Sequence, residues 1–114
     1  MQRPDRLRLQ HMLEAAREAQ VSVAAKSRKD LDADRMLQLA LVRAIEIFGE
    51  AASQVSAESR SQLNTFPWRE VIGMRNRLIH AYFNIDLDIL WNTTIGDLPT
   101  LIHEIERALE SIGE

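Results

Sequence analysis

Apolar residues recur at steps of three and four positions along most of the chain, a spacing that places side chains on one face of an α-helix. The first such pattern runs from Asp5 to about Val23 and predicts an amphipathic helix. The apolar face of this helix consists of Leu9, Met12, Leu13, Ala16 and Ala19.

The second pattern predicts the helix that forms the core of the domain. The segment 27–30 interrupts the periodicity, and the acids at positions 30, 32 and 34 lie where negative charge stabilises a helix N-terminus. A helix is expected from there to about Val55. Gly49 lies inside it and costs about 1 kcal/mol relative to Ala, which predicts close approach of another helix. The apolar positions are Leu37, Leu41, Ala44, Ile45, Phe48, Ala52 and Val55, with Ile47 and Ala51 beside them.

The next pattern predicts a short connection followed by a third helix. Residues 56–65 are mostly polar and leave room for one helical turn, opening at Ser59, whose spacing to Gln62 resembles a capping box. Pro67 fits the first turn of the third helix, where a backbone donor is not needed. This helix is expected to continue into residues 73–83, and its apolar residues are Trp68, Val71, Ile72, Leu78 and Ile79.

The C-terminal part predicts a further helical stretch and a last helix. Asp86 can cap the stretch containing Leu87 to Trp91, Gly96 is expected to interrupt it, and Pro99 to restart a helix that reaches Ile112. No stretch alternates over strand length, and no repeat or linker divides the chain. The sequence predicts a single all-α domain over residues 1–114, with four main helices in an up-and-down bundle and short additional helices.

Composition narrows the possible chemistry. The 114 residues include no cysteine, so disulfides, thiol nucleophiles and thiolate metal sites are excluded, and none of the three His is paired at helical ligand spacing. No metal or other cofactor is therefore expected. The start of the chain lacks the apolar segment of a signal peptide, and no apolar run is long enough to span a bilayer. We expect a soluble, cytoplasmic protein.

Charge is unevenly distributed along the chain. The formal net charge is −3, which argues against a protein coated in nucleic acid through bulk charge, and residues 84–114 hold seven acids against one Arg. Residues 68–83 instead hold Arg69, Arg75 and Arg77 against Glu70. This basic island suits a small anionic group or a phosphate held at one place.

On a regular helix, the polar residues of this basic island would form one stripe of polar side chains. Arg69, Gly73, Asn76 and His80 would share a narrow face, with Arg77 at its edge. A solvated face of an amphipathic helix is the plainer interpretation. Glycine at the centre of the stripe and the one-sided charge favour a phosphate site instead.

Arg75 and His80 carry the chemistry that RNA cleavage without a metal requires. Histidine titrates near neutral pH and can act as general base or acid, and arginine can hold a phosphate bidentately. Five residues apart on a regular helix, the two side chains diverge by roughly 140°. Either the helix loosens between them, or a second chain completes the site across a two-fold axis.

The segment Arg75-Asn76-Arg77-Leu78-Ile79-His80-Ala81-Tyr82 resembles the Arg-x4-His-x-Tyr signature of the HepT-like proteins, which belong to the HEPN superfamily of helical ribonucleases. The resemblance extends to residues 48–51, 67–69, 86–91 and 97–99, and so covers nearly the whole chain.

This resemblance implies a homodimeric, metal-independent endoribonuclease toxin with Arg75 and His80 as the catalytic pair. Asn76 matches the polar residue that follows the motif arginine. The implied partner is a minimal nucleotidyltransferase antitoxin (MNT), which modifies Tyr82 with AMP from ATP. RNA is the implied substrate, and DNA is not expected.

Two other functions compete with the toxin. A catalytically silent HEPN-type module could bind a nucleotide or a partner nucleotidyltransferase through the same basic cleft, and the intact Arg75 and His80 favour the nuclease over it. A phosphotransfer domain ranks last, because residues after His80 do not resemble such domains. His11 and His103 fit surface or packing roles, and Trp68 and Trp91 fit the core better than base stacking.

Overall fold

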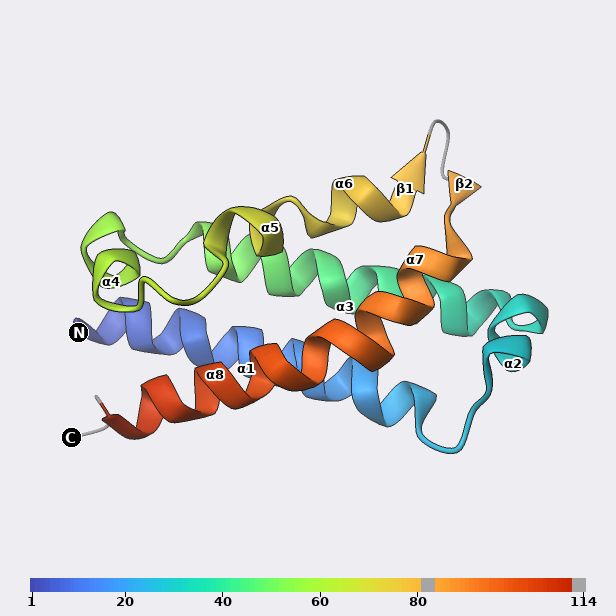
Figure 1. Cartoon of the computed structure of the whole chain (residues 1–114), viewed down its shortest axis with the longest axis horizontal. Helices are drawn as coiled ribbons and strands as arrows, with labels where there is room; N and C mark the ends of the chain where they lie inside the picture. The colour runs from blue at the N-terminus through green and yellow to red at the C-terminus, as the bar shows by residue number, and fades with distance from the viewer. Residues whose placement is uncertain (81–83, 112–114) are drawn as a thin grey trace.

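In the computed structural model, which describes residues 1–80 and 84–111, two long antiparallel helices lie side by side (Figure 1). Helix α1 spans Arg3–Val23 and helix α3 spans Arg35–Ser53. The apolar positions predicted for both helices are buried, apart from the half-buried Ile47, so both amphipathic faces are confirmed. Phe48, Leu41 and Met12 are fully enclosed and form the centre of the core.

The predicted start of the second helix was partly wrong, because the segment between α1 and α3 is itself helical. Helix α2 spans Arg28–Ala33, and Ser27 caps it in a reciprocal capping box with Asp30. Asp34 then caps α3 by accepting a hydrogen bond from the Leu37 amide at 3.0 Å. The residues interpreted as a break therefore satisfy the backbone donors at the start of a new helix.

Asp5 joins the first turn of α1 to helix α4 (Ala57–Gln62). This buried carboxylate accepts hydrogen bonds from the Ser56 amide at 2.9 Å and from the Ser56 and Ser59 hydroxyls, both at 2.6 Å. Ser56, and not Ser59 as predicted, is the N-cap of α4. Burial alone would raise the pKa of Asp5, but the hydrogen bonds outweigh it and hold the pKa below its ordinary value.

Asp5→Asn is expected to destabilise the protein by about 1–3 kcal/mol at neutral pH, because three donors lose a charged acceptor. A carboxylate with a lowered folded pKa contributes stability above its unfolded pKa of about 3.9, and loses it as the pH falls through the folded value. Denaturant unfolding should therefore show the parent and the variant converging in acid. Equal stability of the two at pH 7 would contradict this role of Asp5.

The predicted third helix is broken. Helix α5 spans Trp68–Ile72 and helix α6 spans Met74–Leu78, with Gly73 between them. Strands β1 (Ile79–His80) and β2 (Asn84–Ile85) follow and pair antiparallel, with Ile79 opposite Ile85. With two residues each, these strands are too short to appear as alternation in the sequence. The Asp86 amide donates to the Leu78 carbonyl at 2.7 Å, where a longer helix would have supplied its own donor.

The close approach predicted at Gly49 is confirmed. A Cβ atom at this position would lie 3.1 Å from the carbonyl oxygen of Val71 and 3.4 Å from that of Ile72. Helix α5 therefore packs backbone against backbone on α3. This contact sets the position of α6 over the same helix.

The last part of the described chain is one continuous helical stretch in place of the two predicted helices. Helix α7 spans Leu87–Asn92, the π-helix η2 spans Thr93–Asp97, and α8 spans Leu98–Ser111 and packs against α1 (Figure 1). Asp86 caps α7 as predicted, accepting from the Ile89 amide at 3.0 Å. Gly96 does not interrupt the helix but lies within η2, where the Leu98 amide donates to the Thr93 carbonyl five residues back. Ile112, the predicted end of the last helix, lies outside the described residues.

The described chain is mostly helical, which fits the predicted all-α class. The first two predicted main helices correspond to α1 and α3, the third to the broken pair α5 and α6, and the fourth to α8. Within residues 1–80 and 84–111, no helix has the length and apolar character to cross a membrane.

Candidate functional site

The described part of the Arg-x4-His-x-Tyr segment, residues 75–80, lies on α6 and β1, which pass over α3 on one side of the molecule (Figure 1). Arg75, Asn76 and Arg77 are exposed on α6. His80 belongs to β1, where its backbone pairs with Asn84, and its side chain is not among those described. Tyr82 lies outside the described residues.

Helix α6 ends between the two candidate catalytic residues. The helix loosens between them, as one of the two arrangements open from the sequence requires, since Ile79 has extended backbone angles of φ −113° and ψ 118°. The predicted helical stripe from Arg69 to His80 was therefore wrong. It requires regular helix through Gly73 and Ile79, but the helix is interrupted at Gly73 and ends before Ile79.

Arg75 is held by a carboxylate from the core helix. Its Nε–H donates to Oε2 of Glu46 at 2.5 Å, and Arg43 Nη1 lies 3.5 Å from the other oxygen, Oε1. The side chain of Glu46 is 27% exposed and that of Arg75 is 43% exposed. Exposed ion pairs stabilise folded proteins by only about 0–1 kcal/mol, so this pair contributes more to where the guanidinium sits than to stability.

Sequence reasoning missed Glu46. The available signal was a charged residue between Ile45 and Ile47, close to the apolar face of the second helix. Nothing local pointed to Arg75 as its partner, because the two residues are 29 positions apart in the chain.

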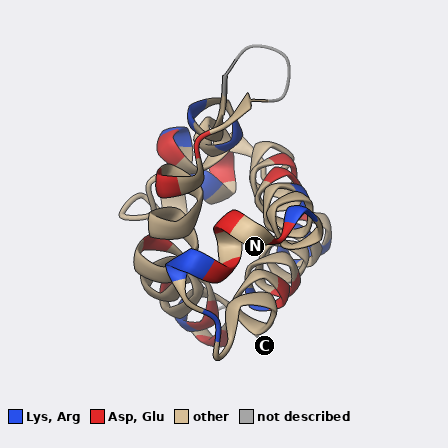
Figure 2. Ribbon diagram, turned by 90° about the vertical axis from the view of Figure 1, so that its right-hand side faces the viewer, with Lys and Arg blue, Asp and Glu red and all other residues tan. Residues whose placement is uncertain are grey.

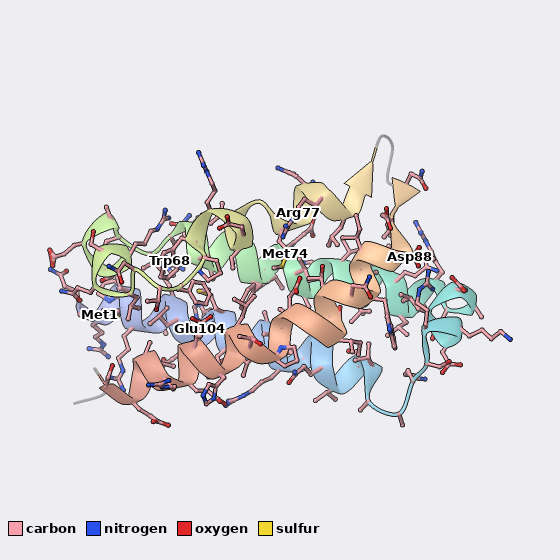
Figure 3. All side chains as sticks on the ribbon, in the orientation of Figure 1. Met1, Trp68, Met74, Arg77, Asp88 and Glu104 are labelled. Atoms are coloured by element: carbon pink, nitrogen blue, oxygen red, sulfur yellow. The ribbon has the colours of Figure 1, made fainter. Side chains whose placement is uncertain are left out.

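Arg77 faces a different environment from Arg75. Residues two apart on a helix point about 200° apart. Arg77 Nη2 donates to the Glu70 carbonyl at 3.4 Å, and its side chain lines a groove of about 410 Å³ between α5–α6 and the start of α8. Figure 3 shows Met74 and Arg77 on α6 and Glu104 on α8, which line this groove together with the carboxylates of Glu70 and Asp97. The basic island is thus split between two faces.

Charges of both signs are interspersed around the rest of the ribbon (Figure 2). Arg69 is exposed on α5. Within the described residues, no group of three or more His, Asp or Glu side chains is placed to hold a metal ion.

The remaining candidates are mainly structural. Trp68 Nε1 donates to the Leu63 carbonyl at 3.1 Å, and its ring contacts Phe66 at a centroid distance of 4.7 Å and lies beneath the Arg60 guanidinium. Trp91 is half-buried against the core. This agrees with the preference for core roles over base stacking. His11 is half-buried and His103 is exposed.

Comparison with known proteins assigns the chain to a protein family. The family described as Ribonuclease HepT-like matches residues 12–112, which include the whole Arg-x4-His-x-Tyr segment. The chain belongs to the HepT-like ribonuclease family. Glu46, Arg75 and His80 of this HepT-like chain all lie within the matched region.

Relatives of this HepT-like chain carry ribonuclease names. It is 34% identical over 102 residues to a putative RNase of Caldanaerobacter subterraneus subsp. tengcongensis, covering 90% of this chain and 91% of the relative. It is 39% identical over 79 residues to a probable ribonuclease HepT of Thermococcus cleftensis, covering 69% and 72%. A gamma-glutamylcyclotransferase and putative RNase of Methanocaldococcus jannaschii is 34% identical over 114 residues, and this chain spans 51% of its length. No solved structure matches the chain.

Proposed function

We propose that this chain is a metal-independent endoribonuclease toxin of the HepT/MNT type, with Arg75 and His80 as its catalytic pair. The observation that carries the proposal is the family match, because it includes the complete signature. Similarity to proteins named as putative or probable RNases supports RNA as the substrate. DNA lacks the 2'-hydroxyl that the proposed reaction uses.

In this reaction His80 removes the proton of the ribose 2'-hydroxyl, and the oxygen attacks the adjacent phosphorus. Arg75 donates to the non-bridging oxygens and stabilises the extra negative charge of the phosphorane. The bond from phosphorus to the 5'-oxygen then breaks, and the protonated His80 returns its proton to that oxygen. The products are a 2',3'-cyclic phosphate and a free 5'-hydroxyl.

Three further polar residues are proposed to hold neighbouring RNA phosphates. Asn76 and Arg69 are exposed near Arg75 in sequence, which supports this role. Arg77 is assigned the same role, although its groove is bordered by carboxylates, so its contribution is expected to be the smallest of the three.

The active form is proposed to be a homodimer whose two-fold axis runs near the motif. Support comes from α3, where Met36 is 76% and Leu39 is 44% exposed. Leu39 lies two helical turns from Glu46, and therefore on the same face. A second copy covering these apolar side chains would bring its own motif close to Arg75.

The proposed partner is an MNT-type nucleotidyltransferase antitoxin. The Tyr82 phenolic oxygen would attack the α-phosphate of ATP, which forms a phosphodiester to AMP and releases pyrophosphate. This modification is proposed to neutralise the toxin.

The proposal is tested by incubating purified protein with RNA in EDTA and analysing the ends produced. Cleavage is expected to persist and to leave 2',3'-cyclic phosphates, because Arg75 and His80 perform the roles that a metal would otherwise fill. A strict requirement for magnesium would defeat the mechanism. Binding of RNA or nucleotide with no cleavage would favour the silent module instead.

A further inference from the structure

Glu46 contacts one particular edge of Arg75. A guanidinium carries five N–H donors, one on Nε and four on the two Nη atoms. The hydrogen bond to Glu46 uses Nε, and neither Nη atom bonds a described residue. Among the described residues, therefore, none uses the paired donors suited to bidentate phosphate binding.

The Glu46 carboxylate belongs to a helix that is packed in the core. Glu46 sits midway along α3, between the buried Ile45 and the half-buried Ile47, two residues before the fully buried Phe48. Arginine has several rotatable bonds, and a long exposed side chain explores many rotamers unless a partner restricts it. A carboxylate on a packed helix is a suitable restraint, because its own position is set by the core.

The charge of Glu46 is shared between two arginines. Arg43 Nη1 lies 3.5 Å from Oε1, and Arg75 Nε lies 2.5 Å from Oε2. The three side chains together carry a formal charge of +1, so the cluster still attracts an anion. A phosphate can bind the Nη edge of Arg75 without displacing Glu46 from the Nε edge.

We infer that Glu46 is a positioning residue, which holds the Arg75 guanidinium through Nε so that its Nη donors face the scissile phosphate. This inference rests on the proposed function, since it assigns Arg75 to that phosphate. It adds a residue from α3 to a site otherwise composed of the motif alone. In this role Glu46 does not compete with the phosphate for Arg75, because the two bind different edges of the guanidinium, and Glu46 need not move away before RNA binds.

Two substitutions separate these roles. Glu46→Gln keeps an oxygen that can accept from Nε, and its kcat for RNA cleavage is expected within about threefold of the parent. Glu46→Leu removes the acceptor, and its kcat is expected to fall about 10- to 100-fold, because a misdirected catalytic group costs about that much. KM should not rise in either variant, since a negative charge beside the phosphate site is lost. Glu18→Leu, at an exposed position on α1, is the matched control and should cleave like the parent.

A second measurement does not depend on activity. The Arg75 Nε–H resonance, assigned by its absence in Arg75→Lys, should be protected from solvent exchange in the parent and in Glu46→Gln. It should exchange rapidly in Glu46→Leu. Thermal midpoints should stay within a few degrees, which separates misplacement of Arg75 from unfolding.

The inference is overturned if Glu46→Leu cleaves at the parental rate or faster, or if Glu46→Gln loses as much kcat as Glu46→Leu. The first result would mean that Glu46 has no role or competes with phosphate, and the second that charge matters and orientation does not. A parent chain that cleaves no RNA defeats the proposed function instead. The Nε–H resonance then decides whether Glu46 holds Arg75, and an unprotected resonance in the parent overturns the inference.

Discussion

His80→Ala and Arg75→Ala should each reduce RNA cleavage about 10²- to 10⁴-fold while leaving the helical content unchanged. Loss of a general acid–base removes about 10²- to 10⁴-fold of rate, and loss of a donor to the developing oxyanion about 10²- to 10³-fold. Arg75 is exposed and makes an exposed ion pair, so its truncation leaves the core intact. Initial rates on a defined RNA, with circular dichroism of the same samples, provide the measurement.

The chain offers matched controls for both substitutions. His103 and Arg107 are exposed on α8 and are not among the residues that line the Arg77 groove, so their alanine variants should cleave RNA like the parent. In a bacterial host, expression of the parent and of both controls should arrest growth, and expression of the two motif variants should not. Normal arrest by both motif variants would remove the catalytic assignment.

The same two variants test whether the site is shared between chains. A mixed dimer of one Arg75→Ala chain and one His80→Ala chain retains one wild-type copy of each residue. If a site takes Arg75 from one chain and His80 from the other, one of the two sites is intact, and about half the parental activity should return. If each chain builds its own site, the mixed dimer should be as inactive as either variant.

Co-expression with an MNT-type nucleotidyltransferase should abolish RNA cleavage by this chain. Each AMP unit on Tyr82 adds a negatively charged phosphodiester two residues from His80, near Arg75 and Arg77 in sequence, and adds bulk that RNA would have to displace. Both effects oppose binding of a polyanion. Intact-mass spectrometry should find one or more AMP additions, peptide mapping should place them on Tyr82, and the modified protein should not cleave.

Tyr82→Phe is the control for this modification. It keeps the ring and removes the acceptor oxygen, so the variant should cleave RNA like the parent and stay toxic when the partner is present. If the partner neutralises Tyr82→Phe as fully as the parent, inhibition comes from complex formation, and AMP transfer to Tyr82 is not the mechanism.

Local sequence determined the elements whose stabilising partners lie within one or two turns of the chain. The apolar faces of α1 and α3 follow from helical periodicity, and Asp86 caps α7 through an amide three residues away. The close helix contact predicted at Gly49 was also correct, because a glycine that destabilises a long helix is usually offset there by close packing. The assignment of Arg75 and His80 rests on a local pattern as well, the Arg-x4-His-x-Tyr segment, and stays a prediction.

Tertiary structure decided where the motif leaves the helix and what holds Arg75. Periodicity alone continues the third helix through Ile79. In the structure the helix ends at Leu78, whose carbonyl accepts from the Asp86 amide beside the paired strands β1 and β2. Glu46 meets Arg75 only because α5 packs against Gly49 and carries α6 over α3. Hydrogen bonds between residues distant in the chain leave no periodic trace in the sequence, since they depend on how helices pack and not on the preferences of the residues that form them.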